Sequence, residues 1–250
     1  MGDSGIPLSR NYSAHSAGSD LAALLTYLNI NQTYVFAHDK GAGLATSLAI
    51  EHPSLVSRII LAEYALPGFG YPYAVTSPNA YLNWQLAFFA VPDAAEFFIQ
   101  GRVKEMLSWY FWHASYSGTA SVSREHLERY TNEISKPGFL RAGMEYFAAA
   151  FEDEKYFMRK LGNGTGRLRM PLLALGGEAS LSPVSLVQQA WAGVGANLVA
   201  QVIPKAGHWI ADENPLWTAE RALRFFGEGE RIGRVDLGYL RDRVTLRSGF

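Results

Sequence analysis

Two short, uninterrupted apolar stretches, each following a helix-like stretch, limit the possible folds of this chain more than any other feature. "TYVFA" (33–37) and "SRIILAEY" (57–64) are rich in β-branched and other apolar residues and indicate buried strands. "DLAALLTYL" (20–28) and "GAGLATSLAIEHP" (41–53) carry the apolar and small residues of helices that pack on a sheet. Helix, strand, helix, strand at this spacing is typical of a parallel α/β sheet.

The same alternation returns near the C-terminus. We expect strands at "MPLLALGGE" (170–178) and "ANLVAQVIP" (196–204), and helices at "SPVSLVQQAWAGV" (182–194) and "PLWTAERALRFFG" (215–227). The two halves of the pattern therefore belong to one core, and a long segment is inserted between them.

The segment between the two halves has a different character, because it is helical in pattern and rich in aromatic residues. We interpret residues 66–167 as a helical insertion that covers a core made of residues 1–65 and 168–227. The last residues, 228–250, carry charges of both signs without a clear period and form a tail whose role the sequence does not indicate.

Composition narrows the classes of partner. Of the 250 residues 48% are hydrophobic, which is ample for a buried core. Lys and Arg number 22 against 23 Asp and Glu, so the formal charge of -1 gives no long-range field that would favour nucleic acid or an anionic membrane. We therefore expect a small-molecule partner.

Several common features are missing from the sequence. The chain has no cysteine, no signal-like start, and no run that approaches the roughly 18 apolar residues of a membrane span. No His/Asp cluster has the spacing of metal ligands. We accordingly predict a cytoplasmic protein that needs no metal and no cofactor.

The turn between the first strand and its helix holds the most reactive candidate. In "AHDKG", Asp39 lies at the tip of a sharp strand-to-helix turn, where the N–H groups at the helix start stabilise a negative charge. Ala37 and Gly41 supply the small residues that such a turn favours on either side. A carboxylate in this position is exposed above the sheet and able to act as a nucleophile.

At this turn the sequence resembles the α/β-hydrolases with an aspartate nucleophile, which include epoxide hydrolases and dehalogenases. Epoxide hydrolases commonly read "GHDxG" here, close to "AHDKG". The resemblance implies that Asp39 attacks an sp3 carbon to form an ester, which a histidine-activated water then hydrolyses. "KAGHW" places His208 where that family has its catalytic histidine.

The acid that orients the histidine has two candidate positions. Many epoxide hydrolases carry it after the strand that here ends in "GGEAS", where the usual aspartate position falls on Ser180 and Glu178 is two residues away. Another branch places it after the strand that follows the nucleophile, where Glu63 lies. Because adjacent parallel strands end side by side, we favour Glu63 over Glu178.

The middle segment resembles the lid of epoxide hydrolases, in which two acidic side chains donate hydrogen bonds to the epoxide oxygen. The first donor position falls on Gln85 or Trp84, and the second falls on Phe147, with Tyr146 beside it. Lys40 could pair with a substrate carboxylate, as an arginine does in fluoroacetate-type enzymes. The resemblance thus implies five candidate substrate-binding residues.

The resemblance also implies that this chain holds only part of the family's core. "MGDSGIP" matches a point after the fourth strand, so we expect the first half of the fold, with its "H-G-x-P" loop, to lie upstream of Met1 and about four core strands to remain. "TYVFA" would then be an exposed edge able to pair with a second copy of the chain.

Three functions follow as expectations. The first is hydrolysis of an epoxide on a lipophilic small molecule, given the aromatic lid. The second is dehalogenation of a haloacid or haloalkane, which is disfavoured because the histidine–tryptophan halide cradle falls on Gln85 and Leu86. The third is a catalytically silent relative that binds a small molecule.

Overall fold

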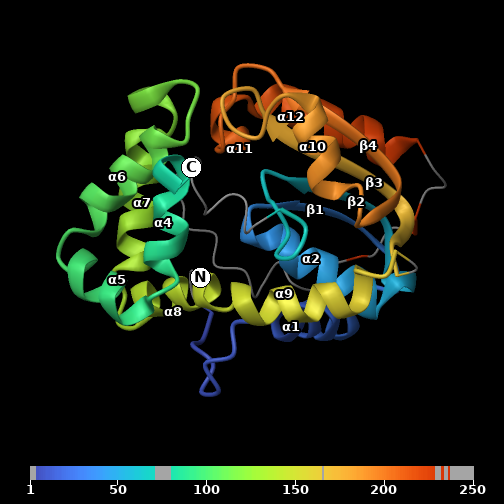
Figure 1. Ribbon diagram of the computed structural model, residues 1–250, viewed down its shortest axis with the longest axis horizontal. Coiled ribbons are helices and arrows are strands. Elements are labelled where there is room, and N and C mark those ends of the chain that lie inside the picture. Colours follow the sequence, from blue (N-terminus) through green and yellow to red (C-terminus); the bar gives the residue numbers. More distant parts are fainter. Residues whose placement is uncertain (1–3, 71–79, 165, 229–231, 234–235, 237–250) are drawn as a thin grey trace.

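A parallel β-sheet forms the centre of the protein. The structure is a computed structural model, which describes residues 4–70, 80–164, 166–228, 232, 233 and 236. In this part of the chain four strands pair in the order β1 (Thr33–His38), β2 (Val56–Ala62), β3 (Leu168–Gly177) and β4 (Gly195–Ile203), as Figure 1 shows. All three pairings are parallel. The predicted strands are present, with ends that differ by one or two residues.

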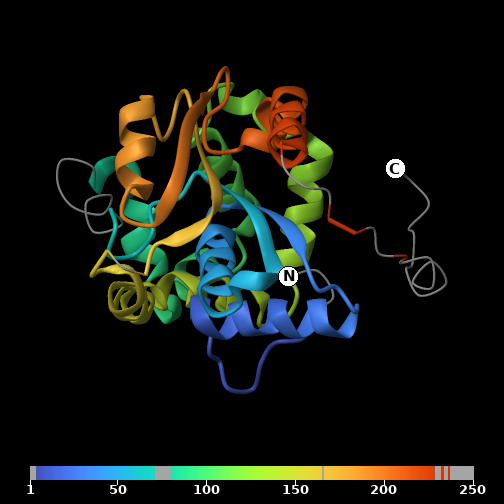
Figure 2. The ribbon, with the colours of Figure 1, turned by 90° about the vertical axis from the view of Figure 1, so that its right-hand side faces the viewer.

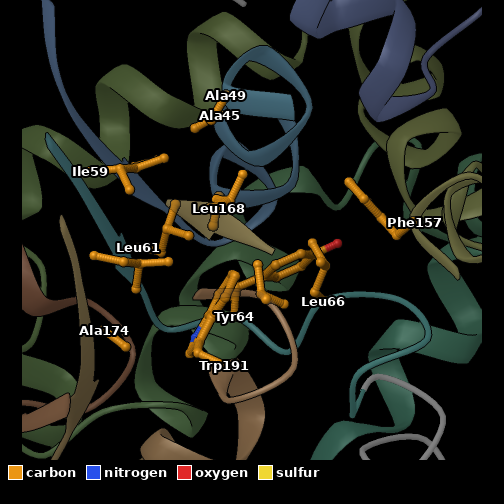
Figure 3. Packing of buried hydrophobic residues seen from close by; sticks show 14 of the residues in the cluster. Ala45, Ala49, Ile59, Leu61, Tyr64, Leu66, Phe157, Leu168, Ala174 and Trp191 are labelled. Atoms are coloured by element: carbon orange, nitrogen blue, oxygen red, sulfur yellow. The ribbon is translucent and has the colours of Figure 1, made fainter. Parts of the chain in front are cut away.

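One face of the sheet packs against α1 (Ala14–Tyr27), α2 (Lys40–Glu51), α9 (Ala150–Leu161) and α10 (Val184–Trp191). Ile59, Leu61 and Ala174 point into this layer, where Phe157 and Trp191 fill the space between helices and sheet (Figure 3). Each fully buried aliphatic side chain of this kind contributes roughly 1.5–3 kcal/mol through its removal from water.

The opposite face packs against α11 (Ile210–Glu213) and α12 (Pro215–Gly227). Ile60, Leu173 and Leu175 point to this side, because successive residues of a strand face opposite sides of the sheet. In Figure 2 the helices α1 and α12 accordingly lie on opposite sides of the strands. Burial on both faces explains why the central strands read as continuous apolar runs.

The first helix begins earlier than predicted, at Ala14 rather than at residue 20. Ser13 caps it, with its hydroxyl accepting a hydrogen bond from the N–H of Ser16. The added turn consists mainly of small residues, and a Cβ at Gly18 would lie 2.8 Å from Ser47 Oγ of α2. Close approach of two helices, rather than an apolar stripe, therefore supports this part of α1.

The middle of the chain is helical, as predicted. It contains α4 (Ala80–Phe89), α5 (Pro92–Ile99), α6 (Val103–His113), α7 (Arg124–Ile134) and α8 (Phe139–Ala148), which gather beside the sheet in Figure 1. These helices share a hydrophobic cluster of their own, distinct from the two sheet layers.

Helix α9 ends the insertion differently, because its Tyr156, Phe157 and Leu161 pack with the sheet rather than with the other inserted helices. The division at residues 66 and 167 remains a prediction, and the predicted tail lies almost entirely outside the described residues. Among the described helices, none combines the length and the apolar character that crossing a membrane requires.

Strand β1 forms one edge of the sheet in the described part of the chain, where it pairs with β2. Phe36 on this strand is 41% exposed. The carboxyl ends of β1, β2 and β3 lie side by side, with Ala62 of β2 next to His38 and Leu175. Side chains that follow these strands are therefore brought to one edge of the sheet.

Candidate active site

Asp39 occupies a sharp turn between β1 and α2. Its backbone has φ 49° and ψ -132°, a positive-φ conformation that is rare for residues other than glycine. The N–H of Asp39 donates to the carbonyl oxygen of Ala62 at 3.0 Å, and its own carbonyl accepts from the N–H of Ala42 at 2.8 Å. These bonds hold a strained backbone that projects the carboxylate away from the end of the sheet.

His208 follows β4 and lies between two carboxylates. Its Nε2 is 3.6 Å from Asp39 Oδ2, and its Nδ1 is 2.9 Å from Glu63 Oε2. Three residues that are distant in the sequence thus form a chain of carboxylate, imidazole and carboxylate at the carboxyl end of the sheet.

Electrostatic interactions within the site favour the charged forms of both His208 and Asp39. Burial alone would lower the pKa of His208, but Asp39 and Glu63 outweigh it and raise that pKa to about 10. Burial would likewise raise the pKa of Asp39, but His208, His38 and Lys40 hold it below its ordinary value. At neutral pH the site therefore contains an Asp39 carboxylate beside an imidazolium.

Glu63 is the buried end of this chain of groups, with 5% of its surface exposed and φ 54°. Its Oε1 accepts from the N–H groups of Gly177 at 2.5 Å and Leu181 at 3.3 Å. Its Oε2 accepts from Ser180 Oγ at 2.6 Å as well as from His208. The carboxylate therefore has a donor on every side, and Ser180 serves it from the position where many epoxide hydrolases carry the acid.

Glu178, the other candidate acid, lies apart from this arrangement. Glu178 is exposed, and its Oε2 accepts a hydrogen bond from the N–H of Lys205 at 2.8 Å. The close approach of the two turns at this point requires Gly177, where a Cβ would lie 2.0 Å from the carbonyl oxygen of Gly207. The structure brings Glu63 to His208 and separates Glu178 from it.

His38, the residue before Asp39, supports the His208 backbone. Its Nε2 donates to the carbonyl oxygen of His208 at 2.7 Å, and the two rings lie 4.8 Å apart. Burial and the neighbouring His208 lower the pKa of His38, so it is neutral at neutral pH. These contacts give His38 a structural role in holding the turn of His208.

Glu213 connects the His208 turn to the helical insertion. Its Oε2 accepts from the N–H of Gly207 at 2.6 Å, and its Oε1 accepts from the N–H groups of Tyr116 and Ser117 at 2.8 and 2.7 Å. The N–H of His208 also donates to the carbonyl oxygen of Ala114 at 2.7 Å. The turn that carries the imidazole is thus hydrogen-bonded to the segment after α6.

A cleft of about 270 Å³ opens between the sheet edge and the inserted helices. Its core side contains the carboxylates and imidazole described above, and its lid side contains polar and aromatic groups. The lining residues are Asp39, Glu63, Tyr64, Ala65, Asn83, Gln85, Leu86, Tyr110, His113, Ala114, Ala179, Ser180, Leu181 and His208.

Only one of the predicted lid contacts lines this cleft. Gln85 does, whereas Trp84 is 44% exposed and packs against Trp109 at a ring distance of 5.1 Å. Tyr146 packs edge-on against Tyr12, 5.0 Å away. The helix carrying Tyr146 presents it to the N-terminal segment rather than to the cleft.

Lys40 and Phe147 form a contact behind the cleft. Lys40 Nζ lies 4.7 Å from the centre of the Phe147 ring and 5.6 Å from that of Tyr64. Burial lowers the pKa of Lys40, while Asp39 and Asp153 oppose that effect. Neither Lys40 nor Phe147 belongs to the residues that line the cleft.

The sequence analysis missed the aromatic and imidazole groups that α6 contributes to the cleft. Tyr110 and His113 lie three residues apart on that helix, and both line the cleft. Tyr110 packs edge-on against Trp209, the residue after His208, at 5.1 Å. Their spacing on one helical face was a usable signal, but the aromatic run around them conceals which face is buried. No group of metal-ligating side chains occurs among the described residues.

Comparison with known proteins agrees with this architecture. A family model described as the alpha/beta hydrolase fold matches residues 1–215. The soluble epoxide hydrolase of Corynebacterium sp. (strain C12) is 25% identical over 234 residues, which cover 90% of this chain and 77% of that protein. A fluoroacetate dehalogenase of Burkholderia sp. is also 25% identical, over 92% of this chain and 74% of its own length.

Solved structures show the same relationship. The crystal structure of wild-type Cfl2 from Burkholderia cenocepacia superposes with a TM-score of 0.80 and 30% sequence identity, covering 90% of this chain and 76% of that one. The expected fold class is confirmed by the family match and by this superposition. The chain therefore belongs to the α/β-hydrolase family and, within it, to the branch of hydrolases that resemble epoxide hydrolases.

Proposed function

We propose that this protein hydrolyses an epoxide on a lipophilic small molecule through an ester formed on Asp39. The observation that carries the proposal is the placement of His208 in the cleft, 3.6 Å from Asp39 and 2.9 Å from Glu63. A nucleophile, a base and an acid that orients the base are the three groups that such a reaction requires.

In the first step an Asp39 oxygen attacks an epoxide carbon, and the carbon–oxygen bond of the ring breaks. The pKa of Asp39 is held low, so the attacking carboxylate is already ionised at neutral pH. The alkoxide that leaves requires a proton, and the phenol of Tyr110 lines the cleft beside Trp209. We assign the donation of this proton to Tyr110, in place of the predicted first donor position at Gln85 or Trp84 and the second at Phe147 or Tyr146.

In the second step a water attacks the ester carbonyl, its proton passes to His208 Nε2, and the diol and the Asp39 carboxylate are released. Esterification removes the negative charge of Asp39, which is one of the two charges that raise the pKa of His208. His208 can then give up its proton, through water in the cleft, to the tyrosinate of Tyr110. Formation of the ester thereby converts the imidazolium into the neutral base that the second step needs.

The oxygen that becomes negative in this second step needs donors as well. Lys40 directly follows Asp39 as the first residue of α2, and we assign this donation to its backbone N–H. The side chain of Lys40 lies behind the cleft against Phe147, so it contributes a positive charge near Asp39 rather than a substrate contact.

Dehalogenation is the second candidate, and the likeness to a fluoroacetate dehalogenase favours it. In that reaction the Asp39 carboxylate would displace a halide instead of opening a ring. Gln85 and Leu86 line the cleft where that family has a histidine–tryptophan pair, and the Lys40 ammonium is not on the cleft wall to bind a carboxylate. A catalytically silent relative that binds a small molecule is the third candidate.

Mass spectrometry of peptides from the full-length chain distinguishes the three candidates. His208→Gln protein would be incubated with a panel of alkyl and aryl epoxides, or with halogenated acids, and digested after an acid quench. An adduct on the Asp39 peptide from epoxides alone supports the proposal, and Asp39→Ala must remove it. An adduct from haloacids alone would assign the second candidate. No adduct from either panel would leave the silent relative.

A further inference from the structure

Gln85 occupies an unusual place on the lid wall of the cleft. It lies on α4, two residues after Asn83, whose φ of -124° and ψ of 21° interrupt the helix. Both side chains line the cleft, and Gln85 is only 5% exposed. A glutamine buried to this extent normally has its amide fully hydrogen-bonded.

Two atoms of cleft-lining residues are buried without a hydrogen-bond partner in the described part of the chain. One is His208 Nε2, on the core wall, and the other is Gln85 Oε1, on the lid wall. His208 Nε2 faces the Asp39 carboxylate at 3.6 Å and takes a proton from water in the proposed reaction. Gln85 Oε1 has no comparable partner among the described residues, and an unpaired buried carbonyl oxygen destabilises the folded protein.

The hydroxyl of Ser180, which also lines the cleft, is directed elsewhere. It donates to Glu63 Oε2 at 2.6 Å and so does not serve Gln85. None of the described groups donates to Gln85 Oε1, so a donor on a molecule bound in the cleft is suited to pair with it.

We propose that Gln85 Oε1 accepts a hydrogen bond from an O–H or amide N–H group of the substrate, close to the carbon that Asp39 attacks. The inference rests on the proposed function for the identity of the reacting carbon. The donor is an uncharged group, because the imidazolium of His208 already places a positive charge in the same cleft and would repel an ammonium. The substrates are thus small epoxy alcohols or epoxy amides rather than simple hydrocarbon epoxides.

A buried acceptor selects strongly against molecules that cannot donate to it, because it is then desolvated and unpaired. We therefore expect a 2,3-epoxy-1-alkanol to be turned over with at least ~10²-fold higher kcat/KM than its methyl ether, which has no donor. Gln85→Met, which removes the acceptor but keeps the length of the side chain, should reduce this preference to within ~3-fold. Gln85→Glu keeps an acceptor and should retain it.

Gln100→Met is the matched control, because Gln100 is exposed at the end of α5 and does not line this cleft. Its preference should equal that of the unsubstituted chain. Equal kcat/KM values for the alcohol and the ether in the unsubstituted chain would overturn the inference, as would an unchanged preference in Gln85→Met.

A binding measurement separates this inference from the proposed reaction. The saturated 1-alkanol of the same chain length and its methyl ether cannot react with Asp39, and their dissociation constants can be measured by calorimetry. A preference for the alcohol that disappears in Gln85→Met supports the inference even if no epoxide is turned over. Equal binding of alcohol and ether overturns it even if epoxides are hydrolysed.

Discussion

Replacing Glu63 with glutamine tests whether the hydrogen bonds around that side chain determine the state of His208. Glu63 Oε1 accepts from the N–H groups of Gly177 and Leu181, and Oε2 accepts from Ser180 and His208. Glutamine keeps one oxygen and replaces the other with NH2. If that NH2 faced Gly177 and Leu181, donors would meet donors, so the amide oxygen must remain on their side.

The NH2 group then faces His208 Nδ1, which can accept a hydrogen bond only if the imidazole carries its proton on Nε2. Nε2 is the atom 3.6 Å from Asp39 that must take a proton from water, so this tautomer cannot act as the base. In a serine protease a wrong tautomer with intact geometry costs ~10⁴ in turnover. We expect Glu63→Gln to lower turnover by ~10³ to 10⁴, or about 4 to 5.5 kcal/mol of transition-state stabilisation.

The assay follows both steps of the reaction. Because attack by Asp39 needs no base, quenched-flow mass spectrometry should show the ester accumulating in Glu63→Gln while product formation falls. Glu178→Gln is the control, because Glu178 is exposed, lies outside the cleft, and accepts a hydrogen bond from the N–H of Lys205. Turnover within ~10-fold of the unsubstituted chain, or an equal loss in Glu178→Gln, would refute the reasoning about the tautomer.

Two further predictions concern the proton donor and the pH dependence of stability. Tyr110→Phe should slow ester formation from epoxides by ~10² or more, because Tyr110 lines the cleft. Tyr146→Phe should have no effect, because Tyr146 packs against Tyr12. Single-turnover mass spectrometry would measure both rates, and equal rates in the two variants would exclude Tyr110 as the donor. The raised pKa of His208, about 10 against ~6.5 in the unfolded chain, means that its ion pairs stabilise the fold fully below pH ~6.5 and that this contribution is lost as the pH rises through about 10. Denaturant titrations from pH 7 to 11 should show this loss in the unsubstituted chain and a flatter profile in His208→Gln, and identical profiles would contradict the assigned pKa.

Sequence reasoning succeeded where a residue's neighbours along the chain determine its position. Strands β2 and β3 are buried on both faces, so their apolar runs are continuous and indicate strands directly. The turn at Asp39 is encoded locally by a strand, a short polar link and a helix of small residues. The predicted fold and family were confirmed, and the roles of Asp39, His208 and Glu63 remain predictions that the geometry supports.

Sequence reasoning was limited where position depends on the rotation of a helix. Helix α6 carries four consecutive aromatic residues, 109–112, which point in different directions around the helix, so the sequence does not show which of them faces the cleft. Tyr146 and Phe147 are adjacent, yet one packs against Tyr12 and the other lies under Lys40, and Tyr110 on a different helix lines the cleft. The choice between Glu63 and Glu178 likewise depended on how two turns meet in space.

The hydrogen bonds of Glu213 bear on how such a protein can acquire new substrates. Since its carboxylate joins the turn of His208 to Tyr116 and Ser117, the covering helices are not an independent module that recombination could exchange freely. A chimaera that imports only the segment after α6 would leave Glu213 without its donors and would disturb the imidazole instead of reshaping the cleft. When inserted helices are exchanged by recombination, we therefore expect the turn of His208 and Glu213 to be inherited together with the segment after α6. Substitutions that change the substrate should then occur mainly in α4, around Gln85.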